Sequence, residues 1–282
     1  CGIISVSFCW FWSRNCLVLP IGKMTSTNSK DTNNVNQDEL IIEQQRKIER
    51  EIAGLIPLIG PKESFKHLHE EYVNDPIYTK KVTDLESKYC HLRKTRPDGN
   101  CFFRAFTFAY MESLLADKDE CERFRKIVEA SKDNLIALGF SKFTLEDFHE
   151  ILMDTILKTS KPITVEDLEN IFNNDQGYSD YIVVYMRLLT SGQLQEQSDF
   201  FLNFLEGGRT VEEFCHQEVE PMYRESDHIH IIALTNALNV GVRVEYMDRG
   251  EGGQINAHNF PEDCQPRVFL LYRPGHYDIL YR

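Results

Sequence analysis

The sequence lacks an excess of positive charge. Its 31 lysines and arginines are outnumbered by 44 aspartates and glutamates, which gives a formal net charge of −13 at pH 7. Phosphate groups are bound by basic surfaces, so this composition excludes nucleic acid as the main partner. The hydrophobic share of 42% over 282 residues is ordinary for a globular protein of one large domain or two small ones.

Motifs for metal ions and phosphate groups are also missing. None of the cysteines forms a C-x-x-C pair; they stand at positions 1, 9, 16, 90, 101, 121, 215 and 264. The neighbours Cys90-His91 and Cys215-His216 cannot make a zinc site on their own. No G-x-x-x-x-G-K phosphate loop is present, and we interpret the two Glu-Gly-Gly runs as turns. We therefore expect no metal, no cofactor and a monomeric protein.

A long uninterrupted apolar segment is absent as well. Residues 1–23 begin apolar, but Arg14 and Asn15 interrupt them before they could span a bilayer. They show no leading methionine, basic start or clear cleavage site of a signal peptide. We interpret them as upstream translated sequence or a fragment artefact that precedes a start at Met24. A chain of this length needs no disulfides, which favours the cytoplasm, with the nucleus as a second compartment, and no membrane association.

The N-terminal part is predicted to be separate from the globular domain. The segment 1–37 ends in a run of Ser, Thr, Asn and Asp, so we expect it to be disordered or artefactual. An Asn-x-x-Glu capping pattern then predicts a helical arm over 38–56. The arm carries an apolar stripe of Ile41, Ile48 and Leu55, which packs either on the domain itself or on a protein partner.

The remaining residues, 57–282, are predicted to form an α+β domain. Helices are expected at 63–72, 77–88, 101–116, 118–138, 144–158, 164–173, 178–189, 196–205, 210–217 and 227–238. Strands are expected at 89–94, 241–247, 268–272 and 277–281. Thr144 and Thr164 are each followed three residues later by an aspartate and are expected to begin their helices. Early helices, late antiparallel strands and few βαβ alternations indicate many helices around a small, mainly antiparallel sheet.

The clearest chemical signal lies in the stretch from Arg96 to Ala105. Pro97, Gly99 and Asn100 favour a turn, and the apolar spacing from Cys101 onward predicts a helix with one buried face. Cys101 would then stand at a helix N-terminus, which stabilises a thiolate over a thiol. A free cysteine is more often a small buried hydrophobic residue, so the turn alone does not decide between these interpretations.

A second signal stands near the C-terminus. His276 and Asp278 lie two residues apart on a predicted strand, so their side chains share a face at roughly 6.5 to 7 Å along the chain. The carboxylate can then orient the imidazole. Together with Cys101, this is the arrangement of a thiol hydrolase triad.

The other histidines are weaker candidates. His228 and His230 cannot share a helix face, since two residues correspond to about 200° of rotation, so we expect them to pack against the sheet rather than bind a metal. We expect the remaining six to be surface residues: His67, His69, His91, His149, His216 and His258.

These motifs carry a family resemblance. Asp98-Gly99-Asn100-Cys101, followed by Phe-Phe-Arg-Ala, resembles the catalytic cysteine box of the ovarian-tumour (OTU) class of deubiquitinases, and Gly275-His276-Tyr277-Asp278 resembles its histidine and acid. More distinctive segments resemble the otubain branch of that class over about residues 38 to 282. They are Asp180–Arg187, Glu206–Val211, Glu225–Leu234 and Glu245–Gly250.

The resemblance implies a papain-like cysteine protease fold with 57–282 as the OTU catalytic domain. It implies hydrolysis of isopeptide bonds at the C-terminal glycine of ubiquitin, with a preference for chains linked through lysine forty-eight of ubiquitin. It also places Asp98 with the active site, where we expect it to support the loop rather than move protons. Ubiquitin, polyubiquitin chains and ubiquitin-conjugating enzymes are the implied partners.

The expected mechanism starts from the triad. His276 takes the proton of Cys101, or already holds it in an ion pair, and the thiolate attacks a carbonyl carbon. Backbone amides of the turn from Asp98 to Cys101 are expected to receive the oxyanion, while Asp278 fixes the histidine tautomer.

Two alternatives remain open at the level of residues. The domain could hold ubiquitin or a conjugating enzyme without cleaving anything, and the N-terminal arm could inhibit that enzyme. The same triad also serves other acyl transfers, such as transglutamination or peptide hydrolysis.

Overall fold

The computed structural model describes residues 44, 51, 55–250 and 253–282. The predicted segment 1–37 and most of the predicted arm at 38–56 therefore lie outside the described residues.

A sheet of six strands forms the centre of the domain, in the order β1-β2-β6-β5-β3-β4. The strands are β1 Ile59–Glu63, β2 His91–Thr95, β3 Val242–Tyr246, β4 Asn256–Phe260, β5 Val268–Arg273 and β6 His276–Tyr281. Neighbouring strands run antiparallel except β3 and β5, which are parallel because β4 turns back to the edge of the sheet. The expected α+β class and mainly antiparallel sheet are thus confirmed, with one parallel pair.

Helices make up most of the rest of the domain. They are α2 Lys66–Glu71, α3 Pro76–Glu86, α4 Cys101–Leu114, α5 Lys118–Ala137, α6 Lys142–Thr159, α7 Val165–Asn173, α8 Gln176–Glu196, α9 Ser198–Phe201, α10 Val211–Phe214 and α11 His228–Leu238, with a 3-10 turn η1 Leu202–Phe204 and a π-helical turn η2 Cys215–Val219. None of the helices in the described part of the chain is long and apolar enough to cross a membrane.

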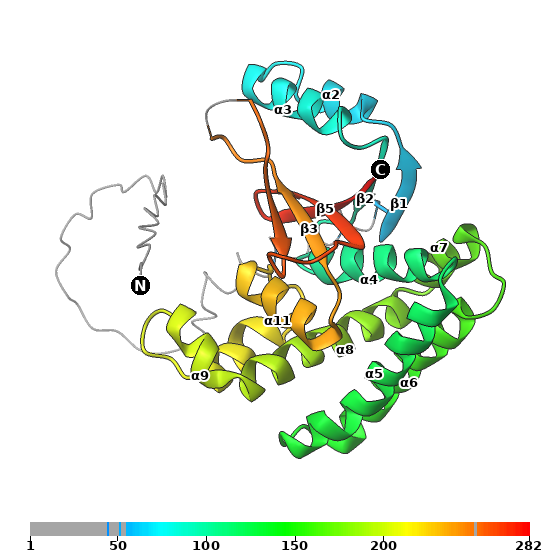
Figure 1. Cartoon of the computed structure of the whole chain (residues 1–282), viewed down its shortest axis with the longest axis vertical. Coiled ribbons are helices and arrows are strands. Elements are labelled where there is room, and N and C mark those ends of the chain that lie inside the picture. The colour runs from blue at the N-terminus through cyan, green and yellow to red at the C-terminus, as the bar shows by residue number, and fades with distance from the viewer. Residues whose placement is uncertain (1–43, 45–50, 52–54, 251–252) are drawn as a thin grey trace, which may run out of the picture. The chain divides into compact units, whose positions relative to one another are not determined.

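Helices cover both faces of the sheet (Figure 1). On one face, Val82 and Leu85 of α3 pack with Leu271 of β5. On the other face lies α4, backed by α5, α6, α8 and α11. Phe102 of α4 contacts Tyr277 of β6, with ring centroids 5.3 Å apart. The start of α4 is therefore fixed beside the β5–β6 hairpin.

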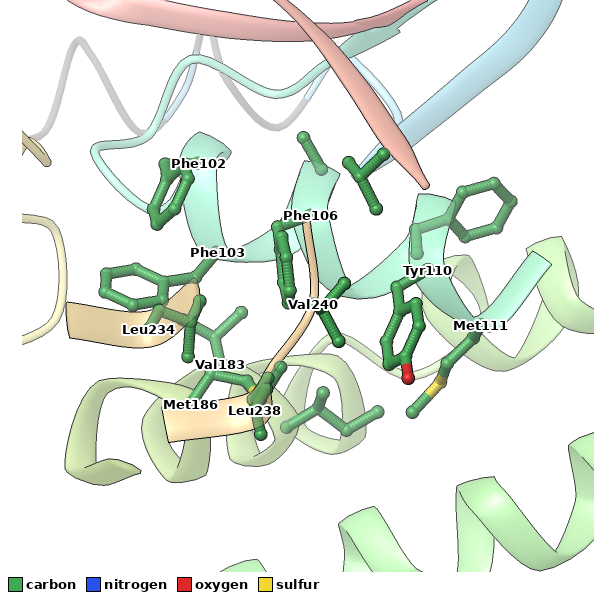
Figure 2. Close-up of a cluster of buried hydrophobic side chains, with 14 of the residues drawn as sticks. Phe102, Phe103, Phe106, Tyr110, Met111, Val183, Met186, Leu234, Leu238 and Val240 are labelled. Carbon is green, nitrogen blue, oxygen red and sulfur yellow. The ribbon is translucent and has the colours of Figure 1, made fainter. Parts of the chain in front are cut away.

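Burial of α4 extends to nearly all of its sides, because the helix lies between the sheet and other helices. Figure 2 shows Phe102, Phe103 and Phe106 of α4 in one cluster with side chains of α8 and α11. Even Arg104 and Thr107 are buried. The prediction of a single buried face was therefore too narrow. A helix that is buried all round is the core of its domain.

The two predicted helix starts give opposite results. Thr164 accepts a hydrogen bond from the Asp167 backbone N at 3.1 Å, and the Asp167 carboxylate accepts one from the Thr164 backbone N at 2.8 Å. This capping box confirms the predicted start of α7. The prediction for Thr144 is wrong, because α6 begins at Lys142 and places Thr144 inside the helix.

Sequence patterns missed the two outer strands, β1 and β4. β1 contains Gly60 and Pro61, and β4 is mostly polar, so neither shows the alternation of a half-buried strand. Edge strands tolerate both features because one side of each is unpaired. The helix predicted at 196–205 is instead the end of α8 followed by α9 and η1.

Candidate active site

The turn before α4 depends on Gly99. Its φ of +75° is left-handed, a conformation that strains any side chain. A Cβ atom at this position would lie 2.6 Å from the carbonyl carbon and oxygen of Tyr223. Glycine is therefore required for both reasons, and the loop at Tyr223 packs directly against the turn.

Asp98 ties the turn to the helix that follows it. Its Oδ1 accepts hydrogen bonds from the Asn100 backbone N and from Arg104 Nη1, both at 2.9 Å. Arg104 in turn donates through Nη2 to Asp180 of α8 at 2.9 Å. Within the described residues, the hydrogen bonds of Asp98 go to the turn and to α4, which agrees with the supporting role predicted for it.

Cys101 is the first residue of α4, as predicted, and its side chain is buried. Two other buried thiols, Cys121 and Cys215, lie against backbone carbonyls. Burial raises the pKa of both thiols, that of Cys215 to about 11. They are therefore protonated at neutral pH.

His276 and Asp278 lie on one face of β6, as predicted. His276 Nε2 and Asp278 Oδ1 are 2.8 Å apart, and the Asp278 side chain is fully buried. The strand alternation explains this pairing, because Tyr277 between them points to the opposite face and packs on Phe102.

The Asp278 carboxylate has two further donors. Thr95 of β2 donates its backbone N–H to Oδ1 at 3.0 Å, and Arg273 of β5 donates through Nη2 to Oδ2 at 2.6 Å. Burial by itself raises the pKa of Asp278, but His276, Arg273 and Thr95 outweigh it and leave the pKa below its usual value. Asp278 is therefore ionised at neutral pH.

His276 is held in its protonated form. Burial lowers its pKa, but the hydrogen bond to Asp278 and the interaction with Cys101 overcome this and raise the pKa to about 9. Its second ring nitrogen, Nδ1, is buried and has no other hydrogen-bond partner in the described chain. Since Nε2 is bound to Asp278, Nδ1 is the nitrogen that remains for the Cys101 thiol. The geometry is that of an imidazolium poised beside a nucleophilic sulfur.

Only part of the turn remains available to bind an oxyanion. The Asp98 backbone N donates to the Arg96 carbonyl at 3.0 Å, and the Asn100 backbone N donates to Asp98. The amides of Gly99 and Cys101 have no such bond within the described residues. These two amides are the ones that can stabilise a developing negative charge beside the sulfur.

Sequence reasoning missed three residues that hold the site together: Thr95 and Arg273, which bind Asp278, and Arg187, which binds the turn. Arg187 belongs to a segment that the resemblance singled out without a role. Arg273 stands three residues before His276, so its nearness along the chain was the one available signal.

The remaining histidines take structural positions. His228 stacks on Tyr246 of β3, with ring centroids 5.0 Å apart, and His230 Nδ1 accepts the Asp227 backbone N–H at 3.0 Å. His228 therefore packs on the sheet as predicted, whereas His230 packs on Phe214 of α10, with ring centroids 5.7 Å apart. The surface prediction is wrong for His149, which is half-buried and lies 3.1 Å from the Val128 carbonyl. No group of three metal-binding side chains occurs within the described residues.

Comparison with known proteins places this geometry in a family. The family model Peptidase C65 Otubain matches residues 51–282. The chain is 55% identical to ubiquitin thioesterase OTUB1 of Homo sapiens over 257 residues, which cover 91% of this chain and 94% of that protein. It is 42% identical to the ovarian tumour domain-containing deubiquitinating enzyme 1 of Arabidopsis thaliana, over 85% of this chain and 86% of that protein.

Solved structures agree with the sequence comparisons. A complex of h/ceOTUB1 with ubiquitin aldehyde and UBCH5B~Ub matches with a TM-score of 0.81 at 36% identity, over 87% of this chain and 98% of that one. The corresponding complex with UBC13~Ub also has a TM-score of 0.81, at 37% identity, over 88% of this chain and 99% of that one.

Proposed function

Because this chain belongs to the otubain family of peptidases, we propose that it cleaves isopeptide bonds at the C-terminal glycine of ubiquitin, with Cys101 as the nucleophile. It is a cysteine-type deubiquitinase, that is, a thiol-dependent ubiquitinyl hydrolase. The observation that carries the assignment of the residues is the convergence of Cys101 at the start of α4 with the His276–Asp278 pair on β6.

The chemistry follows from the charges of the site. The Cys101 sulfur attacks the carbonyl carbon of the terminal glycine, and the oxyanion is received by the amides of Gly99 and Cys101. His276 is protonated, so it can give its proton to the departing lysine amine. Water, deprotonated by the now neutral His276, then hydrolyses the thioester and releases ubiquitin.

Asp278 and Asp98 have different roles in this proposal. Asp278 is buried and bound to His276, so it orients the imidazole and stabilises the imidazolium. Asp98 is bound to Arg104 and to the Asn100 backbone N, so it maintains the turn and does not take part in proton transfer.

We propose a preference for chains linked through lysine forty-eight of ubiquitin, and it is supported by the family resemblance alone. Incubation of the full chain with di-ubiquitins of every linkage tests it. We expect the lysine forty-eight dimer to be cleaved fastest. Equal rates on all linkages would contradict the preference and leave the hydrolase assignment intact.

A second, non-catalytic function is binding and inhibition of ubiquitin-conjugating enzymes through the N-terminal arm at 38–56. It is supported by the similar structures, whose descriptions include ubiquitin aldehyde together with UBCH5B~Ub or UBC13~Ub. Ubiquitin and such enzymes are therefore the proposed partners.

Deletion of residues 24 to 54 separates the two explanations for the apolar stripe of the arm. If the stripe meets a partner, cleavage of a minimal ubiquitin-tail substrate survives while di-ubiquitin cleavage or binding to the conjugating enzyme weakens. If the stripe packs on the domain, the thermal midpoint and every activity fall together, and the partner role is excluded.

A further inference from the structure

Arg187 of α8 is a buried cation whose partners are unusual. Its side chain has no exposed surface, and it forms no ion pair within the described residues. Burial lowers its pKa to about 10, but it is still charged at neutral pH. The two other most buried arginines near the core each bind carboxylates: Arg104 binds Asp98 and Asp180, and Arg93 binds Glu169. Burial of an unpaired charge costs free energy, so the hydrogen bonds that Arg187 forms in place of an ion pair need an explanation.

The guanidinium of Arg187 is bound by oxygen atoms of the active-site loops. Nη2 lies 2.9 Å from the Gly99 carbonyl oxygen, 2.9 Å from Asn100 Oδ1 and 2.7 Å from the Arg224 carbonyl oxygen. Nη1 donates to the Val219 carbonyl at 3.0 Å. The guanidinium also lies over the ring of Phe103, 4.6 Å from its centroid.

These bonds fix one particular peptide unit. The carbonyl of Gly99 is held by Arg187, and the N–H of the same unit, on Asn100, is held by the Asp98 carboxylate at 2.9 Å. Asn100 is held again through its side chain, which accepts from Arg187 and from the Tyr223 backbone N at 3.0 Å. The unit lies between the Gly99 and Cys101 amides, so its plane determines where both of them point.

We propose that Arg187 is a positioning residue for acyl transfer, which keeps the Gly99–Asn100 peptide oriented so that the flanking amides face the substrate oxyanion. It acts through the turn and touches neither substrate nor reacting atoms. The inference rests on the proposed function, since it assigns the energetic role of Arg187 to the acylation of Cys101. It predicts a loss confined to steps that develop an oxyanion.

Arg187→Lys is the informative variant because it keeps the charge but removes the fork of two nitrogens. Two reactions of the full chain are compared, each below the thermal transition. The first is release of a fluorophore from the ubiquitin C-terminus, which requires an oxyanion. The second is alkylation of Cys101 by iodoacetamide, followed by peptide mapping, which requires a reactive sulfur but no oxyanion. Arg93→Lys is the control, since Arg93 is also buried, with 3% of its surface exposed, and lies outside the site.

In Arg187→Lys we expect kcat to fall about tenfold to hundredfold, somewhat less than the loss of a whole oxyanion donor. KM and the alkylation rate should stay within about twofold of the parent, and Arg93→Lys should keep the parent kcat. An unchanged kcat, or an equal fall in fluorophore release and alkylation, would overturn the inference.

If Arg187→Lys shows no cooperative thermal transition, the variant Asn100→Ala is used to test the inference instead. It removes one acceptor of Arg187 and the contact to the Tyr223 backbone while leaving the Gly99 carbonyl bond in place. We expect about a tenfold lower kcat with parental alkylation; a parental kcat would overturn the inference. A parent protein that alkylates at Cys101 but releases no fluorophore would instead overturn the proposed function, and this inference with it.

Discussion

Arg273 at the end of β5 and Asp278 on β6 form a buried ion pair, with Nη2 and Oδ2 2.6 Å apart. The pair joins the two strands of the hairpin that carries His276, and it leaves the other carboxylate oxygen for the imidazole. Arg273 also binds Glu71 of α2 at 2.7 Å. The orientation of the histidine is thus linked to α2, which packs on the face of the sheet opposite to α4.

Asp278→Asn should impair both activity and stability. An amide no longer selects the useful tautomer of His276, which can cost up to about 10⁴ in turnover in a triad. Because Arg273 is left without its buried carboxylate, the free energy of unfolding should also fall by about 3 kcal/mol. Urea denaturation and kcat measurements test the two effects separately. The double variant Asp278→Asn, Arg273→Gln should recover part of the stability and none of the turnover; recovery of turnover would contradict the role of Asp278.

Cys101→Ser should abolish ubiquitin release and keep ubiquitin binding, because a hydroxyl is a far weaker nucleophile than a thiolate. Cys121→Ser is the control, since Cys121 is buried in α5 and its thiol is protonated at neutral pH. It should lower the thermal midpoint at most. Cleavage at the parental rate by Cys101→Ser would refute the mechanism.

The raised pKa of His276 predicts how stability depends on pH. The imidazolium is favoured in the folded state, so its contribution is complete below pH 6.5 and is lost as the pH rises through about 9. The shift from 6.5 to about 9 corresponds to about 3 kcal/mol. Urea denaturation at pH 6 and pH 10 should show this loss in the parent and a smaller one in His276→Gln. Identical losses in both proteins would show that other groups determine the slope.

Gly99→Ala should disrupt the turn more than left-handed strain alone. A left-handed residue other than glycine costs about 1 to 3 kcal/mol, and the new Cβ would also meet the Tyr223 carbonyl at 2.6 Å. Gly208→Ala is the matched control, because Gly208 has a φ of +69° and no atom within 4 Å of the added Cβ. Thermal melting should show a loss in both variants, and only Gly99→Ala should lose activity. Parental activity in Gly99→Ala would mean that the turn can move without consequence.

The two threonines of the helix-start predictions give a test of capping. Thr164→Ala should lower the free energy of unfolding by about 1 kcal/mol, because it removes an acceptor for the Asp167 backbone N. Thr144→Ala should change it by no more than about 0.5 kcal/mol, since Thr144 is exposed inside α6 and caps nothing. Neither should change kcat. A larger loss at Thr144 would place the start of α6 there after all.

The parts of the site that the sequence could predict are those encoded locally. The turn before Cys101 and the alternation of His276 and Asp278 each need only a few neighbouring residues, and the structure brings these side chains together. Arg187 could not be predicted, because its acceptors lie on segments far away in the chain and become neighbours only when α8 packs under the turn. Thr95 binds Asp278 through its backbone N–H, a group that every residue except proline carries, so the sequence does not single it out for this contact.

The same reasoning explains the fold. A core strand such as β5 can be predicted from its apolar run, whereas β1 and β4 lack such a run and lie at the edges, each paired with one neighbouring strand. The length of α8 was underestimated because Ser191 and Gly192 weaken the helical pattern. Gly192 fits there because Leu135 of α5 approaches within 2.6 Å of where its Cβ would be.

Because Phe102 of α4 contacts Tyr277 of β6, catalytic activity indicates whether α4 has packed on the sheet. The nucleophile belongs to a helix, the base belongs to a strand, and these two aromatic rings connect the layers immediately beside both. A fragment that contains either layer alone holds an isolated thiol or an isolated imidazole and cannot transfer an acyl group. The fraction of molecules labelled by a ubiquitin-tailed electrophile therefore counts the molecules in which α4 is docked on the sheet, and refolding can be followed with the enzyme as its own reporter.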